Sequence, residues 1–336
     1  MRDGISVRAG RYAVIKRVHT RAFSNIALIK YWGKVPGGDN IPATPSISIA
    51  LRELSTETEV ERFDVGEDRV FINGVKATDK DTERITSYLD MWRELELIEG
   101  NYSISSRANF PIAAGLASSA SGFAALAKAL AEFSRIKLGK RKLSQLARRG
   151  SGSAARSVTG GLSAFPVGKD PAARLLIDAR RLSYGMVAIT VDSARKKISS
   201  REGMEHTRQT SPFYNKWIKL GAQDYKEMLR AINLRNLTRI GELMESNTLA
   251  MHSCIMSARP PIVYWSPATI YIIQKVRSWR DEGLDVYFTI DAGANVFVLC
   301  MKDDMDLVAS KAEKLQGVVK VIKSEPGGGA EVISRQ

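Results

Sequence analysis

The chain has 336 residues, of which 44% are hydrophobic and 26% charged, and its formal net charge is +14 at pH 7. This composition is that of an ordinary globular protein and excludes wholesale disorder. The length predicts about two domains of roughly 150 residues each, or one large α/β unit. No apolar run approaches the ~20 residues that cross a membrane, and the basic N-terminus lacks the apolar stretch of a signal peptide. We therefore expect a cytoplasmic protein with no membrane partner.

The positive charge raises the question of nucleic-acid binding. The Lys and Arg residues are scattered along the chain, and no nucleic-acid-binding motif is present. A positive potential equally suits an enzyme with a polyanionic substrate, and a charge-rich surface typical of thermophiles is the plainest explanation. We expect no nucleic-acid partner. The rival hypothesis, a basic nucleic-acid-binding protein, predicts salt-sensitive binding to duplex DNA or RNA.

The cysteines and histidines are few and far apart. Cys254 and Cys300 form no C-x-x-C pair, which excludes a zinc ribbon or a thioredoxin-type motif. The three histidines (His19, His206, His252) form no H-E-x-x-H pattern. We therefore predict no metal site built from protein ligands, and we interpret both cysteines as buried, small, apolar residues. A disulfide stays open as an alternative.

Hydrophobic periodicity predicts mixed α and β structure in the first half of the chain. The expected elements are strands at 12–18 and 23–31, a hairpin of 56–63 with 69–72 followed by a tight Asn73-Gly74 turn, a helix at 79–97, a strand at 102–107, helices at 118–136 and 143–149, and strands at 160–165 and 186–191.

The second half is richer in helices. We expect helices at 224–234, 239–251 and 268–282, strands at 286–290 and 296–301, a helix at 305–315 and a last strand at 318–323. Strands and helices alternate without strict βαβ periodicity, which favours an α+β or irregular α/β architecture. A soft boundary near residue 190 predicts two lobes, 1–190 and 191–336.

The segment Pro111–Gly122 is rich in glycine, alanine and serine, and it follows a predicted strand and opens a long predicted helix. A helix N-terminus exposes unpaired N–H groups and the positive end of its dipole, and small residues allow a phosphate to approach the backbone. A serine N-cap leading into a packed helix explains the same composition. The segment is neither a G-x-x-x-x-G-K-[ST] loop nor a G-x-G-x-x-G loop.

Four motifs carry a resemblance to a known family. Pro111-x-x-x-Gly115-Leu-x-Ser-Ser-Ala resembles the phosphate-binding motif of the superfamily of galactokinase, homoserine kinase, mevalonate kinase and phosphomevalonate kinase. The segments 25–34 (NIALIKYWGK), 148–157 (RRGSGSAARS) and 289–295 (TIDAGAN) closely resemble signatures of the diphosphomevalonate decarboxylase family. The segments 196–204 and 325–329 also match this family. The likeness covers about residues 22–330, in the same order.

The resemblance implies an enzyme that uses ATP, with Mg²⁺ carried on the nucleotide, to phosphorylate the tertiary 3-hydroxyl of mevalonate 5-diphosphate. Loss of that phosphate with CO₂ then gives isopentenyl diphosphate, ADP and phosphate. The implied fold has an N-terminal α+β lobe like ribosomal protein S5 with a left-handed βαβ unit, and a ferredoxin-like C-terminal lobe. A homodimer is common in the family.

The family's functional residues carry over to matching positions of this chain. The catalytic candidates are Asp291, Arg156, Ser119, Asn25 and Lys34. The substrate-binding candidates are Tyr31, Trp32, Gly33, Lys34, Ser151, Gly152, Ser153, Arg156, Ser200 and Arg201. The ATP-binding candidates are Gly115, Leu116, Ala117, Ser118, Ser119 and Ser121. We expect no protein-held metal.

The residue types suit this chemistry. Arg156 is a two-pronged partner for a carboxylate, and Asp291, after an apolar strand, can take or orient the proton of a hydroxyl. Which of the two Asp291 does is open. Spacing alone also leaves open whether Lys30 and Lys34 are merely solvated. Lys196 and Lys197 are further candidates for neutralising phosphate.

Close relatives offer other outcomes. One branch of the family decarboxylates mevalonate 5-phosphate, another only phosphorylates the 3-hydroxyl, and a third acts on mevalonate bisphosphate. A non-catalytic small-molecule sensor is a further alternative. Lys34, Arg156 and Asp291 together favour the full decarboxylase, without deciding between a monophosphate and a diphosphate.

Overall fold

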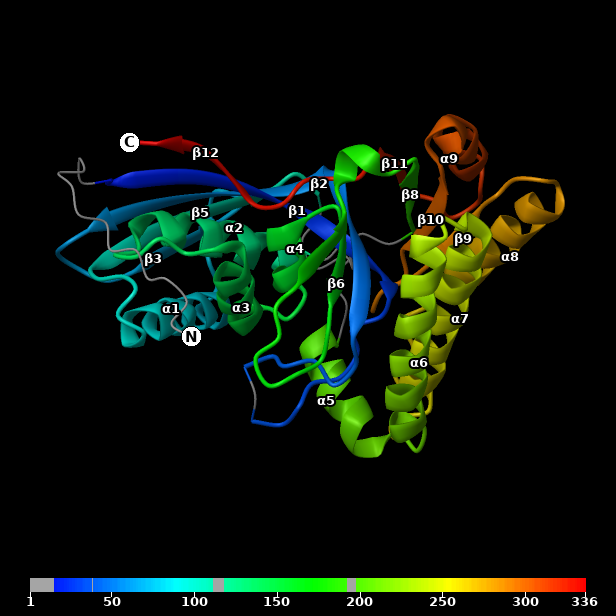
Figure 1. Cartoon of the computed structure of the whole chain (residues 1–336), viewed down its shortest axis with the longest axis horizontal. Helices are drawn as coiled ribbons and strands as arrows, with labels where there is room; N and C mark the ends of the chain where they lie inside the picture. Colours follow the sequence, from blue (N-terminus) through cyan, green and yellow to red (C-terminus); the bar gives the residue numbers. More distant parts are fainter. Residues whose placement is uncertain (1–14, 38, 111–117, 192–197) are drawn as a thin grey trace.

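A computed structural model describes residues 15–37, 39–110, 118–191 and 198–336. The chain forms two β-sheets, an eight-stranded sheet in one half and a four-stranded sheet in the other, with helices packed against both (Figure 1). The predicted α+β architecture of two lobes is therefore confirmed. In the described part of the chain, no helix is both long and apolar enough to cross a membrane.

The larger sheet is organised around two long strands. β1 (Arg17–Ile29) pairs antiparallel with β2 (Ser46–Phe63) over most of its length. The second half of β2 also pairs with β5 (Asn101–Ala108), and its first half pairs with β6 (Leu162–Phe165). β2 therefore serves two branches of the sheet and fixes the position of β6 relative to β1.

Shorter strands complete this sheet. They are β3 (Arg69–Ile72), β4 (Val75–Lys76), β7 (Arg174–Ile177) and, at the end of the chain, β12 (Glu331–Arg335). β3 pairs with β5 in parallel, and α1 (Asp79–Glu94) lies between them in the chain, so these elements form a βαβ unit.

Three further helices join α1 below this sheet in the view of Figure 1: α2 (Ser118–Phe133), α3 (Lys140–Gly150) and α4 (Ala154–Thr159). Their alanines and leucines pack with aromatic side chains such as Trp92 and Tyr102 in one apolar core. Because alanine faces allow close approach, α2 packs directly against β1 and β2. The N-terminus of α2 and the short helix α4 are thereby held near the middle of β1.

The second lobe contains an antiparallel sheet in the order β11–β8–β10–β9. Its strands are β8 (Tyr184–Thr190), β9 (Tyr287–Thr289), β10 (Val296–Met301) and β11 (Lys320–Ser324). Its helices are α5 (Ser200–Thr210), α6 (Tyr214–Asn233), α7 (Leu237–Met256), α8 (Pro267–Asp281) and α9 (Met305–Glu313). One core, which includes Val187, Val276 and Phe288, lies between this sheet and α8 and α9.

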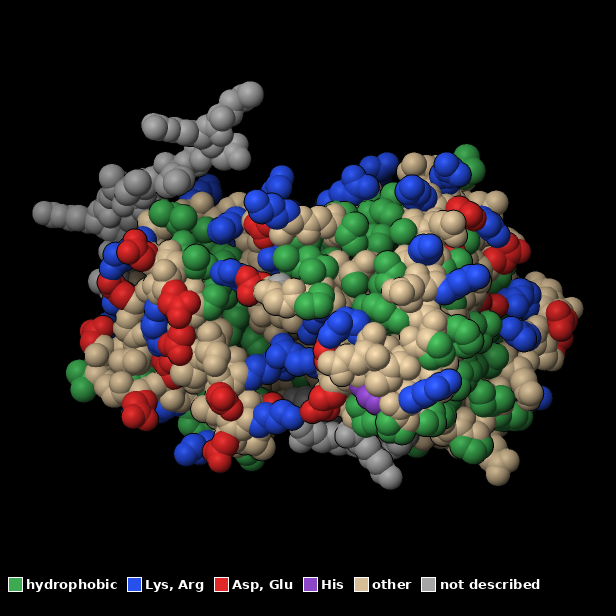
Figure 2. Space-filling view, turned by 90° about the horizontal axis from the view of Figure 1, so that it is seen from below, with side chains coloured by type: hydrophobic (Ala, Val, Ile, Leu, Met, Phe, Trp, Pro, Cys, Tyr) green, Lys and Arg blue, Asp and Glu red, His purple; other side chains and the backbone are tan. Residues whose placement is uncertain are grey.

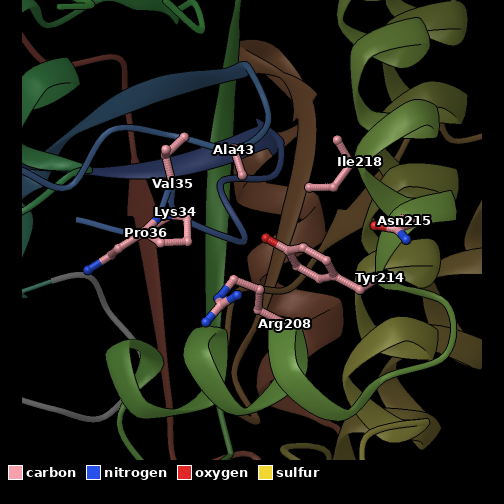
Figure 3. Close-up of a pocket in the computed structure, with 8 residues that line it drawn as sticks. All are labelled: Lys34, Val35, Pro36, Ala43, Arg208, Tyr214, Asn215 and Ile218. Atoms are coloured by element: carbon pink, nitrogen blue, oxygen red, sulfur yellow. The ribbon is translucent and has the colours of Figure 1, made fainter. Parts of the chain in front are cut away.

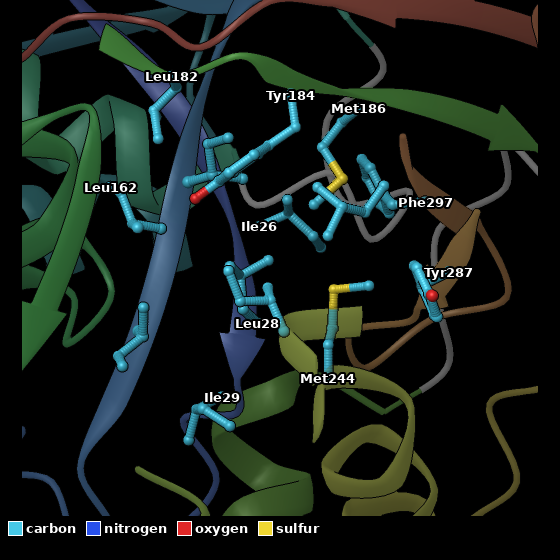
Figure 4. Close-up of a cluster of buried hydrophobic side chains, with 14 of the residues drawn as sticks. Ile26, Leu28, Ile29, Leu162, Leu182, Tyr184, Met186, Met244, Tyr287 and Phe297 are labelled. Atoms are coloured by element: carbon cyan, nitrogen blue, oxygen red, sulfur yellow. The ribbon is translucent and has the colours of Figure 1, made fainter. Parts of the chain in front are cut away.

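A shared core joins the two lobes. Ile26 and Leu28 of β1 pack against Met186, Phe297 and other side chains of the second lobe (Figure 4). Because successive residues of a strand point to opposite faces, β1 sends these apolar residues into the shared core and its intervening residues toward α4. Asn25, the functional candidate on β1, thus lies on a strand that is packed on both faces.

Several details differ from the sequence expectations. The predicted hairpin of 56–63 with 69–72 is wrong, because β2 pairs with β1, β5 and β6, while β3 pairs with β4 and β5. The Asn73-Gly74 turn is confirmed between β3 and β4, and both residues have positive φ. The chain does not finish with the strand near 318–323, since β12 follows it and returns to β1.

Both cysteines are buried and free, as the sequence interpretation of small apolar residues predicts.

Candidate active site

The site is built where β1 ends. Asn25 lies on the face of β1 toward α4, and its amide Nδ2 donates to the hydroxyl of Ser157 at 2.8 Å and to the carbonyl of Ser153 at 3.2 Å. Five residues later Lys30 ends the apolar run of the strand, and its backbone N–H donates to Asn247 Oδ1 of α7 at 2.8 Å. These contacts fix β1 between α4 and the second lobe.

Lys30 and Asp291 form an ion pair between the two lobes. Lys30 Nζ lies 2.7 Å from Asp291 Oδ1, and the Lys30 side chain is only 1% exposed, against 27% for Asp291. Burial lowers the pKa of Lys30, Arg156 lowers it further, and the Asp291 carboxylate opposes both effects. The possibility that Lys30 is a solvated lysine is therefore wrong. Asp291 follows β9 closely and keeps one face open to solvent.

Arg156 of α4 is buried and has only neutral hydrogen-bond partners among the described contacts. Its guanidinium donates to Ser46 Oγ at 2.6 Å, to Ser48 Oγ at 2.8 Å and to Asn25 Oδ1 at 3.1 and 3.2 Å. Burial lowers its pKa to about 10, with the nearby Asp291 charge acting in the opposite direction. A buried cation held by neutral oxygens favours an incoming anion.

Serine hydroxyls from α2 and from the turn before α4 meet beside Arg156. Ser151 Oγ lies 3.3 Å from Ser119 Oγ and 3.4 Å from Ser153 Oγ. The intervening Gly152 packs on Tyr31, because a Cβ atom at this position would lie 2.1 Å from the Tyr31 hydroxyl. The structure thus brings Asn25, Tyr31 and Ser119 together with the predicted residues of segment 151–156.

Three cations, Lys34, Arg84 and Arg201, gather at the opening of the site. The charge of Arg201 contributes to lowering the pKa of both Lys34 and Arg84, and Arg84 also acts on Lys34. Together with burial, which is the larger cause, this lowers the pKa of Lys34 to about 8 and that of Arg84 to about 10. Figure 2 shows Lys and Arg side chains gathered in the middle of the face seen from below. We call Lys34, Arg84 and Arg201 the cation cluster.

Two members of the cation cluster, Lys34 and Arg84, donate hydrogen bonds to neutral groups. Lys34 Nζ donates to Asn40 Oδ1 at 2.7 Å, and Arg84 Nη2 donates to the carbonyl of Gly150 at 3.0 Å. Arg84 Nε is buried and has no hydrogen-bond partner among the described residues. Mutually repelling cations with an unsatisfied donor are stabilised when an anion binds. By contrast, Arg148 is tied to Asp170 at 2.9 Å.

Trp32 packs against α5, and Gly33 packs against the start of α6. A Cβ atom at Gly203 of α5 would lie 2.5 Å from the Tyr264 hydroxyl and 3.1 Å from the Trp32 ring. Gly33 has φ of +114°, and a Cβ atom there would lie 2.3 Å from the Tyr214 hydroxyl. The contact of Gly203 with Trp32 and Tyr264 seats the first turn of α5, which carries the predicted residues Ser200 and Arg201, beside Lys34.

A cavity of about 370 Å³ lies next to Lys34 on the side of α6 (Figure 3). Its walls are mostly apolar and include Val35, Ala43 and Ile218. The ammonium of Lys34 points away from Tyr214 in this view, toward its partner Asn40 outside the cavity. The cation cluster is therefore a better candidate for an anion-binding site than this cavity.

The described part of the segment Pro111–Gly122, which begins α2, is suited to binding an anion. Ser118 and Ser119 begin α2, and its first turn contains no acidic residue. The side chain of Ser119 is exposed, whereas Ser121 is buried and its Oγ lies 2.7 Å from Thr56 Oγ1, away from the helix end. Gly115, Leu116 and Ala117 lie outside the described residues, as do Lys196 and Lys197. Within the described ranges, no group of three or more His, Cys, Asp and Glu could hold a metal ion.

Several site residues were not predicted. Ser46 and Ser48 could have been found from the alternation Ser-Ile-Ser-Ile, which puts both hydroxyls on one face of a strand. Lys30 was in a recognised motif, but its burial depends on Asp291 from the other lobe. Arg84 and Asn40 had no local signal, because their roles come from their contacts with the carbonyl groups of α3.

Two family models match this chain in succession. The diphosphomevalonate decarboxylase-like N-terminal domain matches residues 22–175, and the mevalonate 5-diphosphate decarboxylase C-terminal domain matches residues 186–327. The chain belongs to the diphosphomevalonate decarboxylase family. The family resemblance found in the sequence is therefore confirmed, and the two models leave β12 outside their match.

Individual relatives agree with the family models. A diphosphomevalonate decarboxylase from Candida albicans is 33% identical over 318 residues, which cover 88% of this chain and 87% of the relative. A phosphomevalonate decarboxylase from Haloferax volcanii is 32% identical over 287 residues, or 84% and 87% of the two chains. A solved complex of MDDEF with MVAPP, AMPPCP and magnesium has a TM-score of 0.87 and 35% identity, covering 95% of this chain and 99% of that one.

Proposed function

We propose that this chain catalyses the ATP-dependent decarboxylation of mevalonate 5-diphosphate to isopentenyl diphosphate, ADP, phosphate and CO₂, in the mevalonate pathway of isoprenoid biosynthesis. The observation that carries the proposal is the Lys30–Asp291 pair beside the buried Arg156, with the cation cluster at the opening of the site. Family membership supports it.

Arg156 binds the substrate carboxylate in this proposal. Ser46, Ser48 and Asn25 hold its guanidinium plane in place, so little reorganisation is needed when the carboxylate arrives. The carboxylate also relieves the cost of burying the arginine charge without an anionic partner. Fixing this end of the substrate aligns the bond that breaks when CO₂ leaves.

Asp291 orients the tertiary hydroxyl. Lys30 Nζ binds Oδ1, which leaves Oδ2 to accept a hydrogen bond from the hydroxyl, while the solvent-exposed face of Asp291 is the one that substrate can reach. A positioned carboxylate can draw the hydroxyl proton as the oxygen attacks phosphorus. Lys30 keeps the carboxylate from rotating and balances its charge.

The cation cluster binds the distal phosphates. Three cations at one opening suit a diphosphate better than a monophosphate, because a diphosphate offers more charge and more acceptor oxygens to the same donors. Ser151 and Ser153, whose hydroxyls lie close together beside the cluster, supply additional donors. The remaining substrate-binding candidates shape the pocket by packing: Tyr31 on Gly152, Trp32 on α5, and Gly33 on Tyr214 of α6.

The N-terminus of α2 is the proposed ATP site. ATP supplies the phosphoryl group, and Mg²⁺ carried with it neutralises phosphate charge. Ser118 and Ser119, with the backbone N–H groups of the first turn, bind phosphate oxygens there. Ser119 faces Ser151, so the nucleotide and substrate sites meet at this pair of hydroxyls.

The substrate assignment is tested by incubating purified protein with ATP and, separately, mevalonate, mevalonate 5-phosphate and mevalonate 5-diphosphate. We expect equal amounts of ADP, phosphate and CO₂ with the diphosphate only. CO₂ from the monophosphate alone would make the chain a phosphomevalonate decarboxylase, like its Haloferax volcanii relative. ADP without CO₂ would make it a kinase of the 3-hydroxyl.

The role of the cation cluster is tested with Arg84→Gln. Losing a charged hydrogen-bonding partner should weaken binding of the diphosphate substrate about tenfold or more, with little change in ATP affinity. Arg93→Gln is the matched control on the same helix, because Arg93 is committed to Asp68 and Asp90. Equal substrate affinity in Arg84→Gln and Arg93→Gln would remove Arg84 from the site.

We further propose a homodimer in the cytoplasm, with the two lobes divided shortly before residue 190, because β8 (Tyr184–Thr190) belongs to the second sheet. The homodimer rests on the family resemblance, and the location rests on the small, charged, water-soluble substrates of the proposed reaction. Sedimentation velocity of the purified chain tests the dimer, and a monomer at micromolar concentration would contradict it.

A further inference from the structure

His252 is a buried histidine directly behind the catalytic candidate Asp291. It lies on α7, its side chain is 1% exposed, and its Nε2 is 3.4 Å from the carbonyl oxygen of Ile290. Its ring packs on Trp265 with the ring centroids 4.6 Å apart. The proposed reaction gives His252 no chemical step, although it touches the peptide that presents Asp291.

The environment keeps this histidine neutral. Burial lowers the pKa of His252 to about 3, and the nearby Lys30 charge adds to the effect. A neutral ring can donate one N–H to a carbonyl without adding a third cation beside Lys30 and Arg156. Because a carbonyl oxygen only accepts hydrogen bonds, the bond to Ile290 requires the proton on Nε2.

We propose that His252 is a positioning residue: it donates Nε2–H to the Ile290 carbonyl and thereby holds the backbone at the orientation in which Asp291 meets Lys30 and the substrate hydroxyl. This inference rests on the proposed function. Asp291 lies just beyond the last residue of β9, where the strand no longer constrains the backbone. An external hydrogen bond at this point replaces that constraint.

A second contact between the same elements provides a matched control. One turn earlier on α7, Thr248 Oγ1 lies 3.1 Å from Thr289 Oγ1, and both residues are buried. Thr248 therefore also joins α7 to β9, but its bond does not involve the peptide next to Asp291. A role that is only structural predicts similar effects at both positions, whereas positioning predicts an effect on turnover at His252 alone.

The test compares His252→Leu, His252→Gln and Thr248→Val by steady-state kinetics with both substrates and by thermal unfolding. We expect His252→Leu to lower kcat about 10- to 100-fold, as a displaced catalytic group does, with KM values within about threefold. His252→Gln, whose amide can still donate to the carbonyl, should retain kcat within about fivefold. Thr248→Val should lower the unfolding midpoint while keeping kcat.

Wild-type kcat in His252→Leu would overturn the proposal, and so would an equal loss of kcat in Thr248→Val. If His252→Leu does not fold, His252→Asn takes its place, because its amide is too short to reach the carbonyl. A low kcat in His252→Asn supports positioning, and a wild-type kcat overturns it. The same assay on the wild-type protein separates the two hypotheses, since no turnover there contradicts the proposed function itself.

Discussion

The buried ammonium of Lys30 needs the Asp291 carboxylate as its partner, whereas the partly exposed Asp291 can also be reached by substrate. We predict that Asp291→Asn lowers turnover about 10³-fold, since an amide cannot accept the hydroxyl proton and is a weaker acceptor. Binding of a fluorescent ATP analogue should remain within about threefold of the wild-type protein, because Ser118 and Ser119 are unchanged. Turnover within about tenfold of wild type would remove Asp291 from the mechanism.

The same substitution should also destabilise the fold. Removing one partner of a buried ion pair typically costs about 3–5 kcal/mol, and here it leaves Lys30 buried without its carboxylate. The folded pKa of Lys30 is lowered, so the native state of this variant should gain stability as pH rises and the ammonium loses its proton. The double variant Lys30→Met/Asp291→Asn should regain stability without regaining activity, which separates folding from catalysis.

The lowered pKa of Lys34 predicts that activity falls on the basic side of the pH profile. Its pKa of about 8 means that the free protein loses this positive charge as pH rises through that value. We expect kcat/KM for mevalonate diphosphate to fall above about pH 8, whereas kcat at saturation changes less because bound diphosphate favours the ammonium. Lys34→Arg keeps its charge and should not show this decline. If kcat/KM of Lys34→Arg still falls above about pH 8, the loss of a proton from another group causes the decline.

At the scale of elements, the first turn of α5 is placed by its packing against Trp32 and Tyr264. We predict that Gly203→Ala shifts this turn, because the new methyl group meets the Tyr264 hydroxyl and the Trp32 ring. KM for mevalonate diphosphate should rise about tenfold as Ser200 and Arg201 move, while KM for ATP stays within about twofold. Both constants are measured in one ADP-release assay.

Tyr264→Phe provides the rescue for this prediction. It removes the hydroxyl that lies nearest to the added methyl group, so Gly203→Ala/Tyr264→Phe should recover part of the lost substrate affinity. Tyr264→Phe alone loses the 3.3 Å bond to the Ile198 carbonyl and serves as the control. Unaltered KM in Gly203→Ala would show that α5 tolerates the methyl group without moving Arg201.

Elements with strong local patterns were predictable from sequence, and elements defined by distant pairing were not. The Ala- and Leu-rich helix at 118–133 and the strand at 296–301 follow their periodicity. The hairpin error arose because β2 is 18 residues long and its partners, β5 and β6, come much later in the chain. α5 was missed since only three of its eleven residues are buried.

The same distinction applies to the site. The sequence motifs predicted Asn25, Arg156 and Asp291 as site residues, and the structure brings these three residues together around Lys30. The burial of Lys30, the contribution of Arg84 and the contact of His252 with Ile290 join residues that are far apart in the chain. No local pattern encodes such contacts, because they arise only when α1 packs against α3 and α7 packs against both β1 and β9.

At the scale of the whole molecule, the last strand ties the end of the chain to the first lobe. After β11 in the second sheet, the chain returns as β12 and pairs with β1 at Val18–Arg21. Arg335 binds Glu132 of α2 at 2.9 Å, and Arg21 binds Glu331 at 2.7 Å. β12 therefore covers the outer edge of β1 at the end opposite Lys30, and the paired segment stops before Asn25.

We predict that removing residues 331–336 lowers the unfolding midpoint on the order of 5 °C and promotes aggregation, because the edge of β1 loses its backbone partners. KM values for both substrates should stay within about twofold, since β12 pairs only with Val18–Arg21 of β1, before Asn25 and Lys30. Glu331→Gln removes only the exposed ion pair with Arg21 and should shift the midpoint by less than about 2 °C. An unchanged midpoint after truncation would mean that β12 covers β1 without stabilising it. Altered KM values would instead mean that loss of β12 changes the position of Lys30 at the other end of β1.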